Sequence, residues 1–204
     1  MVRRTKNDEL LSRIKESRKT IQVVAGPRQV GKTTMVKQVL QEVSISSMFF
    51  NADAVENNKS SWISSCWGEA RARMRYAQLK EFLIVFDEIH KIKNWSEYVK
   101  KEWDADTLND VNIKVILLGS SRLLLKKGLS ESLAGRFELI PMGHWSFREM
   151  HDAFGWDINQ YVYYGGYPGS AAYLPNEARW RRYMRDSRLF HLPQKKDIPV
   201  HVRK

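Results

Sequence analysis

"VVAGPRQVGKTTMVKQVL", residues 23–40, decides the fold of this chain. Gly26, four further residues, Gly31, Lys32 and Thr33 fill every position of the phosphate-binding loop pattern. A run rich in β-branched residues, typical of a strand, precedes the loop, and an amphipathic segment, typical of a helix, follows it. This is the context that the pattern requires. The stretch therefore predicts a nucleoside triphosphate site, with a chance match in a flexible loop as the alternative.

Each part of the loop has a chemical task. Glycines let the backbone curl, so that several N–H groups point at the β- and γ-phosphate oxygens, and the positive end of the following helix adds to the attraction. Lys32 supplies a mobile positive charge to the same phosphates, and Thr33 offers its hydroxyl to Mg²⁺. These residues contact only the phosphates and the metal, so they do not predict whether the nucleotide is ATP or GTP.

Short apolar runs alternate with longer amphipathic segments along the chain. The runs are TIQVVAG (20–26), SMFFNAD (47–53), FLIVFDE (82–88), IKVILLGS (113–120) and FELIPM (137–142). Helical patterns lie at 7–17, 32–43, 60–79 and 94–106, and Asn7 or Asp8 is the expected cap of the first. Strands that alternate with helices indicate βα units and a mainly parallel sheet, so the fold class is α/β.

The third run carries its apolar residues directly into Asp87 and Glu88. A buried strand that delivers a carboxylate beside a phosphate loop lets Asp87 hold Mg²⁺, while Glu88 reaches the attacking water as general base or orienting group. The alternative is a surface turn, where paired acids are common. Because nucleotide kinases with the same loop do not need this pair, it favours hydrolysis.

Three further residues are candidates at strand ends. Ser120, with Ser121 beside it, ends the fourth run and is expected to sense the γ-phosphate or to cap a helix. Arg136, just before the fifth run, can act as an arginine finger within the chain or from a neighbouring subunit, or can form a salt bridge. Asn51 can hold Glu88 away from the water, although Asn at a strand end is also ordinary turn chemistry.

Composition and charge limit the function classes. The chain has 204 residues and a formal net charge of +11, and no apolar run is long enough to span a membrane. The single cysteine, Cys66, excludes an internal disulfide framework, and the basic start turns amphipathic where a secretory signal needs an apolar stretch, so we expect a cytoplasmic protein. From Arg179 onward, nine Lys and Arg residues stand against two acids. This segment is either a solvated basic helix with a frayed tail or a contact for DNA or an acidic protein.

Taken together, these residues resemble the AAA+ class of P-loop ATPases, and more narrowly the prokaryotic AAA_14-type ATPases. The resemblance runs from about Thr20 to Ser187. It rests on GPRQVGKTT (26–34), FDEIHKIKNWSEYVK (86–100), LLGSSRLLLKKGLSESLAGRFELIPMGHWSFREM (117–150) and YYGGYPGS (163–170).

The resemblance implies a five-stranded sheet in the order 5-1-4-3-2 and a site for ATP with Mg²⁺. It implies Walker B at Asp87 and Glu88, a sensor at Ser120 and an arginine finger at Arg136. It also implies a Walker A motif, whose expected nucleotide-binding residues are Gly26, Pro27, Arg28, Gln29, Val30, Gly31, Lys32, Thr33 and Thr34.

The expected organisation has three parts. An α/β nucleotide-binding domain occupies residues 1–145, a partial helical lid 146–191, with helices at 146–155 and 178–190 and a loop at 163–170, and an extended basic tail 192–204. Relatives of this kind usually continue into a separate carboxy-terminal domain, so truncation or a frameshift after about residue 187 stays open.

Two functions remain open at this point. The first is a Mg²⁺-dependent ATPase that couples hydrolysis to a conformational switch on a protein or nucleic-acid partner. The second is a nucleotide-dependent binding module with negligible hydrolysis, associated with DNA through the basic carboxy-terminal segment. A finger from a neighbouring subunit would make the protein a homo-oligomer.

Overall fold

The computed structural model describes residues 3–55, 59–120, 124, 132–174 and 176–189. The chain divides into two compact units, Met1–His144 and Trp145–Lys204. The first unit holds the sheet and the phosphate loop, and the second is helical in the part that the structure describes. The predicted tail at 192–204 and the sensor candidate Ser121 lie outside the described residues.

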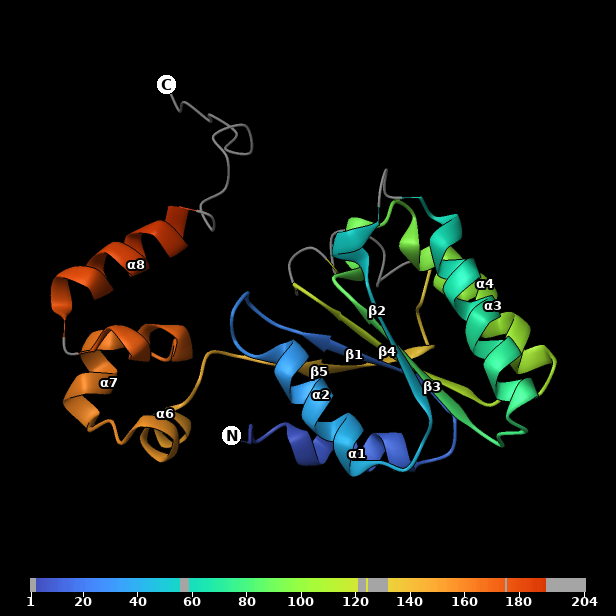
Figure 1. The fold of residues 1–204 in the computed structure, drawn as a ribbon, viewed down its shortest axis with the longest axis horizontal. Coiled ribbons are helices and arrows are strands. Elements are labelled where there is room, and N and C mark those ends of the chain that lie inside the picture. Colours follow the sequence, from blue (N-terminus) through green and yellow to red (C-terminus); the bar gives the residue numbers. More distant parts are fainter. Residues whose placement is uncertain (1–2, 56–58, 121–123, 125–131, 175, 190–204) are drawn as a thin grey trace, which may run out of the picture. The chain divides into compact units, whose positions relative to one another are not determined.

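The first unit is built on one parallel sheet of five strands (Figure 1). Its strands are β1 (Ile21–Ala25), β2 (Ser47–Asn51), β3 (Phe82–Asp87), β4 (Ile113–Gly119) and β5 (Phe137–Pro141). Their order is β2-β3-β4-β1-β5, and all four pairings are parallel. This is the predicted order 5-1-4-3-2 counted from the other edge, so the predicted α/β fold is confirmed.

Helices cover both faces of the sheet. In Figure 1, α1 (Asn7–Lys15) and α2 (Lys32–Glu42) lie on one side, and α3 (Ser61–Tyr76) and α4 (Trp95–Leu108) lie on the other. Successive strand residues point to opposite faces, so Val24 packs in the core with α1 and α2, while Val23 packs in the core with α3 and α4. Burial on both faces is why the central strands are continuous apolar runs instead of alternating ones.

The predicted cap of α1 is wrong. The position before the helix is Lys6, which makes no side-chain cap bond, and Asn7 is already helical. The side chain of Asn7 is buried: its Oδ1 accepts from Arg4 N at 3.1 Å, and its Nδ2 donates to Gln38 Oε1 at 3.1 Å. Asn7 thus links α1 to α2, a tertiary role that local cap preference cannot reveal.

A buried polar cluster joins α3 to α4. Asp106 is 1% exposed and accepts hydrogen bonds from Trp67 Nε1 at 2.6 Å and from Arg71 Nε at 2.7 Å. Arg71 also donates to Glu102 Oε2 at 2.6 Å. Because buried polar groups are costly when unpaired, this cluster fixes how the two helices pack.

The second unit contains α6 (Phe147–Phe154), α7 (Ile158–Tyr164), the 3₁₀ turn η4 (Pro168–Tyr173) and α8 (Glu177–Leu189). Helix α7 was not predicted from the sequence. Its last two residues, Tyr163 and Tyr164, were predicted to lie in a loop. A capping box formed by Asp157 and Gln160 begins this helix. That spacing of Asp and Gln is the signal that would have found it. Across the described residues of both units, no helix is long and apolar enough to cross a membrane.

Candidate functional site

The phosphate loop joins β1 to α2 at the carboxyl edge of the sheet. Gly31 precedes α2 with φ of 89°, a left-handed conformation that favours glycine. Gly26 is required for a different reason: a Cβ there would lie 2.2 Å from the carbonyl oxygen of Met142. One glycine therefore provides the turn into the helix, and the other lets the loop approach the chain that leaves β5.

Thr33 and Asp87 meet beside this loop. Thr33 Oγ1 donates a hydrogen bond of 2.8 Å to Asp87 Oδ2, and the N–H of Glu88 donates to Asp87 Oδ1 at 3.0 Å. Asp87 is the last residue of β3 and is buried. A hydroxyl and a carboxylate are the oxygen ligands that Mg²⁺ prefers, so these two residues fit the predicted metal position.

Lys32, the first residue of α2, is buried with its ammonium facing the loop. Its Nζ donates to the carbonyl oxygens of Gly26 at 3.0 Å and Pro27 at 2.7 Å. Burial lowers the pKa of Lys32, while the negative charges of Glu88 and Asp87 act in the opposite direction. A polyphosphate bound in the loop would give this ammonium anionic oxygens in place of neutral carbonyls.

Glu88 follows β3 in a left-handed backbone conformation, with φ of 52°. Such a conformation is costly for a residue with a side chain, and such positions cluster at functional sites. Burial, followed by the charge of Asp87, raises the pKa of the Glu88 carboxyl, and Lys32 opposes them. On its other side, Glu88 Oε2 lies 3.4 Å from Nε2 of His90, a buried residue.

A pocket of about 400 Å³ opens between the loop and the ends of β2 and β3. It is lined by Arg28, Gln29, Gly31, Lys32, Thr33, Thr34, Asp53, Glu88 and Lys91. Seven of these nine were predicted site residues. The other two, Asp53 and Lys91, form an ion pair.

The sequence analysis missed Asp53 and Lys91. Asp53 lies in η1 (Ala52–Ala54), directly after β2, and Lys91 ends η3 (Ile89–Lys91), directly after Glu88. Both follow the carboxyl ends of parallel strands, which is where ligands bind in sheets of this type. That rule, applied to β2 as it was to β3, would have identified Asp53.

Of the remaining candidates, Ser120 and Asn51 lie at the same edge, whereas Arg136 precedes β5 at the opposite edge, where its carbonyl accepts from Ile21 N. Ser120 directly follows β4 and is half-buried, and its carbonyl accepts from Leu124 N at 2.9 Å. Asn51, beside Asp87 in the sheet register, accepts a hydrogen bond from Asp53 N at 2.9 Å. The Asn51 side chain thus takes part in the turn that follows β2.

Arg136 is held away from the pocket lining. Its Nε and one terminal nitrogen donate to the two carboxylate oxygens of Asp104 in α4, at 2.7 and 3.1 Å. These bonds raise the pKa of the guanidinium. Neither Arg136 nor Ser120 is among the described residues that line the pocket.

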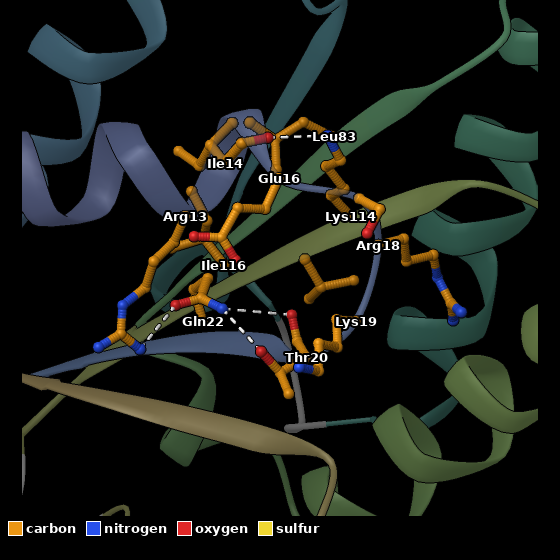
Figure 2. Close-up of a pocket in the computed structure, with 12 residues that line it drawn as sticks. Arg13, Ile14, Glu16, Arg18, Lys19, Thr20, Gln22, Leu83, Lys114 and Ile116 are labelled. Carbon is orange, nitrogen blue, oxygen red and sulfur yellow. Dashed lines mark hydrogen bonds between the residues drawn. The ribbon is translucent and has the colours of Figure 1, made fainter.

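A second, much smaller pocket of about 20 Å³ lies at the amino ends of β1 and β4 (Figure 2). Two of its basic side chains have partners within the pocket: Lys114 Nζ donates to the carbonyl of Ile14 at 2.7 Å, and Arg13 contacts Gln22 Oε1 at 3.4 Å (Figure 2). This pocket lies at the opposite ends of the strands from Thr33 and Asp87, so it is separate from the candidate nucleotide site. It lies where α1 packs on the sheet.

Comparisons with known proteins agree with this fold. The profile of a family described as AAA domain, AAA_14, matches residues 18–151, more than half of the chain. An uncharacterised protein of Methanocaldococcus jannaschii, MJ1544, is 25% identical over 171 residues, which cover 72% of this chain and 35% of that protein. The chain therefore spans about a third of the length of this curated relative.

Two solved structures share the fold. A variant of Thermotoga maritima RuvB matches with a TM-score of 0.52 and 15% identity, covering 74% of this chain and 49% of that one. Aeropyrum pernix ORC1 in complex with DNA matches with a TM-score of 0.54 and 15% identity, covering 74% and 47%. At this identity the likeness concerns the fold alone.

Proposed function

Because the chain belongs to the AAA domain family, AAA_14, we propose that it is a cytoplasmic, Mg²⁺-dependent ATPase whose site is the pocket between the phosphate loop and Glu88. The family and the fold suggest nucleotide binding and hydrolysis. The observation that carries the proposal is the 2.8 Å bond between Thr33 Oγ1 and Asp87 Oδ2, with Lys32 and Glu88 on the same pocket.

In this proposal the loop residues hold the polyphosphate. The loop N–H groups and Lys32 contact the β- and γ-phosphate oxygens, and the amino end of α2 favours their negative charge. Thr33 and Asp87 would hold Mg²⁺, which when bound neutralises charge on the β- and γ-phosphates. The buried ammonium of Lys32 is then paired with anionic oxygen, which offsets its desolvation.

Glu88 is the proposed general base. A water molecule between its carboxylate and the γ-phosphorus gives a proton to Glu88 as its oxygen bonds to phosphorus. The bond from the γ-phosphorus to the bridging oxygen breaks, and ADP and inorganic phosphate leave. Burial beside Asp87 makes Glu88 a better proton acceptor than an exposed carboxylate, in the direction of its raised pKa.

Ser120 and Arg136 are proposed to transmit the nucleotide state of the site to the rest of the protein and to a neighbouring subunit. Ser120 directly follows β4, which lies beside β3 and its terminal Asp87, a suitable position for sensing nucleotide state. Arg136 is paired with Asp104, so we assign its finger role to the pocket of a neighbouring subunit in a homo-oligomer. Closure around ATP would then change how the assembly meets a protein or nucleic-acid partner.

The test is phosphate release from Mg·ATP by the purified chain and by Lys32→Ala and Glu88→Gln. We expect the wild type to turn over, and both variants to lose at least about a hundredfold in rate. Calorimetry should separate the variants, because Lys32→Ala also loses ATP affinity whereas Glu88→Gln keeps it. Wild-type turnover no faster than that of the variants would overturn hydrolysis, and tight ATP binding with no turnover would favour a nucleotide-dependent binding module.

A second proposal concerns DNA. Arg179, Arg181, Arg182 and Arg185 of α8 are exposed, and among proteins of this fold ORC1 has been solved in complex with DNA. We expect duplex DNA to bind with an affinity that falls as salt rises, since phosphate contacts release counterions. Replacing Arg179, Arg182 and Arg185 with Gln should flatten that salt dependence, whereas Arg148→Gln, an exposed arginine on α6, serves as the matched control. An unchanged salt slope in the triple variant would reject this contact.

A further inference from the structure

His90 occupies a buried position between two strand ends of the proposed catalytic site. It lies in η3, the 3₁₀ turn that directly follows Glu88, and is 2% exposed. Two backbone bonds fix this turn: Lys91 N donates to Glu88 O, and Ile92 N donates to Ile89 O, both at 3.0 Å. The turn holds the imidazole in the interior, directly behind Glu88, which lines the pocket.

One edge of the ring faces Glu88. His90 Nε2 lies 3.4 Å from Glu88 Oε2, within ion-pair distance although longer than an ordinary hydrogen bond. The Glu88 side chain is 22% exposed, so part of it reaches the pocket while Oε2 contacts the ring. In the tautomer that carries its proton on Nε2, the imidazole presents an N–H to this oxygen, and a small movement of the carboxylate would complete a hydrogen bond.

The other edge of the ring faces Gly119, the last residue of β4. A Cβ at Gly119 would lie 2.9 Å from His90 Nδ1 and 3.1 Å from Cγ of Leu124. Gly119 has no positive φ, so space and not backbone conformation requires glycine here. The ring therefore fills the whole gap between the Glu88 carboxylate and the strand end that carries Ser120.

We propose that His90 is a positioning residue for Glu88: its ring, wedged against Gly119, sets the direction in which the Glu88 carboxylate meets the attacking water. This inference rests on the proposed hydrolysis and adds a residue that the phosphate loop and the Asp87–Glu88 pair do not include. An apolar side chain of similar size would fill the same gap, but it would remove the ring nitrogen that lies 3.4 Å from Oε2. We therefore expect the role of His90 to require a polar group at this position, and not only its volume.

The proposal predicts a separation of rate from binding. His90→Leu keeps the volume and removes the ring N–H, so kcat should fall at least about tenfold, because misplaced catalytic groups cost that much or more. KM and the Kd for Mg·ATP should stay within about twofold, since the loop residues are untouched. His90→Gln, which can place an amide N–H near the position of Nε2, should recover most of the lost rate.

Gly119→Ala tests the same contact from the opposite side. The added methyl would lie 2.9 Å from His90 Nδ1, and we expect the ring to shift toward Glu88, so kcat should fall as in His90→Leu although Gly119 itself does not line the pocket. Gly68→Ala is the matched control, because a Cβ at Gly68 in α3 meets nothing within 4 Å. Thermal unfolding of every variant identifies those that lose rate only because they unfold.

A second measurement does not depend on turnover. Trapping of Mg·ADP with aluminium fluoride, a mimic of the transferring phosphoryl group, should weaken in His90→Leu and persist in His90→Gln. If the wild type neither turns over nor traps, the proposed function fails and the inference fails with it. If the wild type turns over and a folded His90→Leu protein has wild-type kcat and trapping, or if His90→Gln is no better than His90→Leu, the positioning role alone is overturned.

Discussion

The hydroxyl of Thr33 lies 2.8 Å from the carboxylate of Asp87, although the two residues are 54 positions apart in the chain. Thr33 is in the first turn of α2, and Asp87 ends β3, which is separated from β1 by β4. Parallel strands bring both residues to the same edge of the sheet. Two oxygen ligands of the kind that Mg²⁺ prefers therefore point at one place beside the phosphate loop.

The first prediction concerns this pair. Thr33→Val removes the hydroxyl and should weaken ATP affinity at least about tenfold when Mg²⁺ is present, and much less in EDTA, because the lost group is a metal ligand. Thr33→Ser keeps the hydroxyl and should stay within about twofold of the wild type. Calorimetry with and without Mg²⁺ measures both. Equal losses for Thr33→Val in the two buffers would argue against metal ligation.

The second prediction tests Arg136 across subunits. Arg136→Ala and Glu88→Gln should each hydrolyse ATP at least about tenfold slower than the wild type. An equimolar mixture should exceed the mean of the two, because a mixed assembly contains pockets with an intact Glu88 beside a neighbour with an intact Arg136. The measurement is steady-state phosphate release at concentrations where the protein is oligomeric.

Asp104→Asn is the control for that experiment. Arg136 and Asp104 side chains are 33% and 38% exposed, so losing their ion pair should cost no more than about 1 kcal/mol of unfolding free energy. Asp104→Asn should therefore remain active. A mixture no faster than the mean, or an Asp104→Asn variant as slow as Arg136→Ala, would make Arg136 a structural partner of Asp104.

The third prediction concerns stability. Asp106→Ala leaves the buried indole N–H of Trp67 and the Nε of Arg71 without their acceptor, so the free energy of unfolding should fall by about 3 kcal/mol. Urea denaturation followed by tryptophan fluorescence measures this loss. Glu69→Ala, at an exposed position of α3, should change stability by no more than about 0.5 kcal/mol. Similar midpoints for the two variants would show that the α3–α4 cluster contributes little.

The fourth prediction concerns Cys66, the single cysteine of the chain. Burial, with a smaller contribution from Glu69, raises the pKa of the Cys66 thiol from its ordinary 9.0 to about 12. The thiol should therefore react with iodoacetamide at pH 8 at least about a hundredfold more slowly in the native protein than in urea. Rapid, complete labelling of the native protein would contradict this burial.

The sign of the pH dependence follows from the same shift. Because the pKa of the folded protein is the higher one, the unfolded chain ionises first as pH rises. The contribution of Cys66 to stability is thus complete below about pH 9 and declines as the pH rises from there toward 12. Cys66→Ala should lose this alkaline dependence in urea denaturation carried out across that range.

Some features were predictable because they are local. The central strands β1, β3 and β4 could be recognised from sequence because burial on both faces leaves continuous apolar runs. The helices α2, α3 and α4 could be recognised because their amphipathic patterns are long. Helix α7 was missed because it is only seven residues long and has no buried face to impose a pattern. Its capping box was visible in the sequence, so this error came from reading periodicity alone.

Other features depend on partners that are distant in the chain. Asn7 is a tertiary link rather than a cap because Gln38 of α2 lies beside it. Arg136 is paired with Asp104, and neither spacing nor residue type indicated which acid it would meet. The Asp53–Lys91 ion pair joins the ends of two neighbouring strands, so it could be identified only once the strand order was known.

By itself, the sequence determined the phosphate loop, the carboxylate pair that ends β3 and the parallel α/β class, because glycine conformation, strand burial and helix periodicity act over a few residues. Only the tertiary structure decided that Thr33 meets Asp87 and that His90 fills the gap between Glu88 and Gly119. The physical reason is that these contacts depend on which strand ends become neighbours. Packing of the whole sheet sets that adjacency, and no short stretch of sequence contains it.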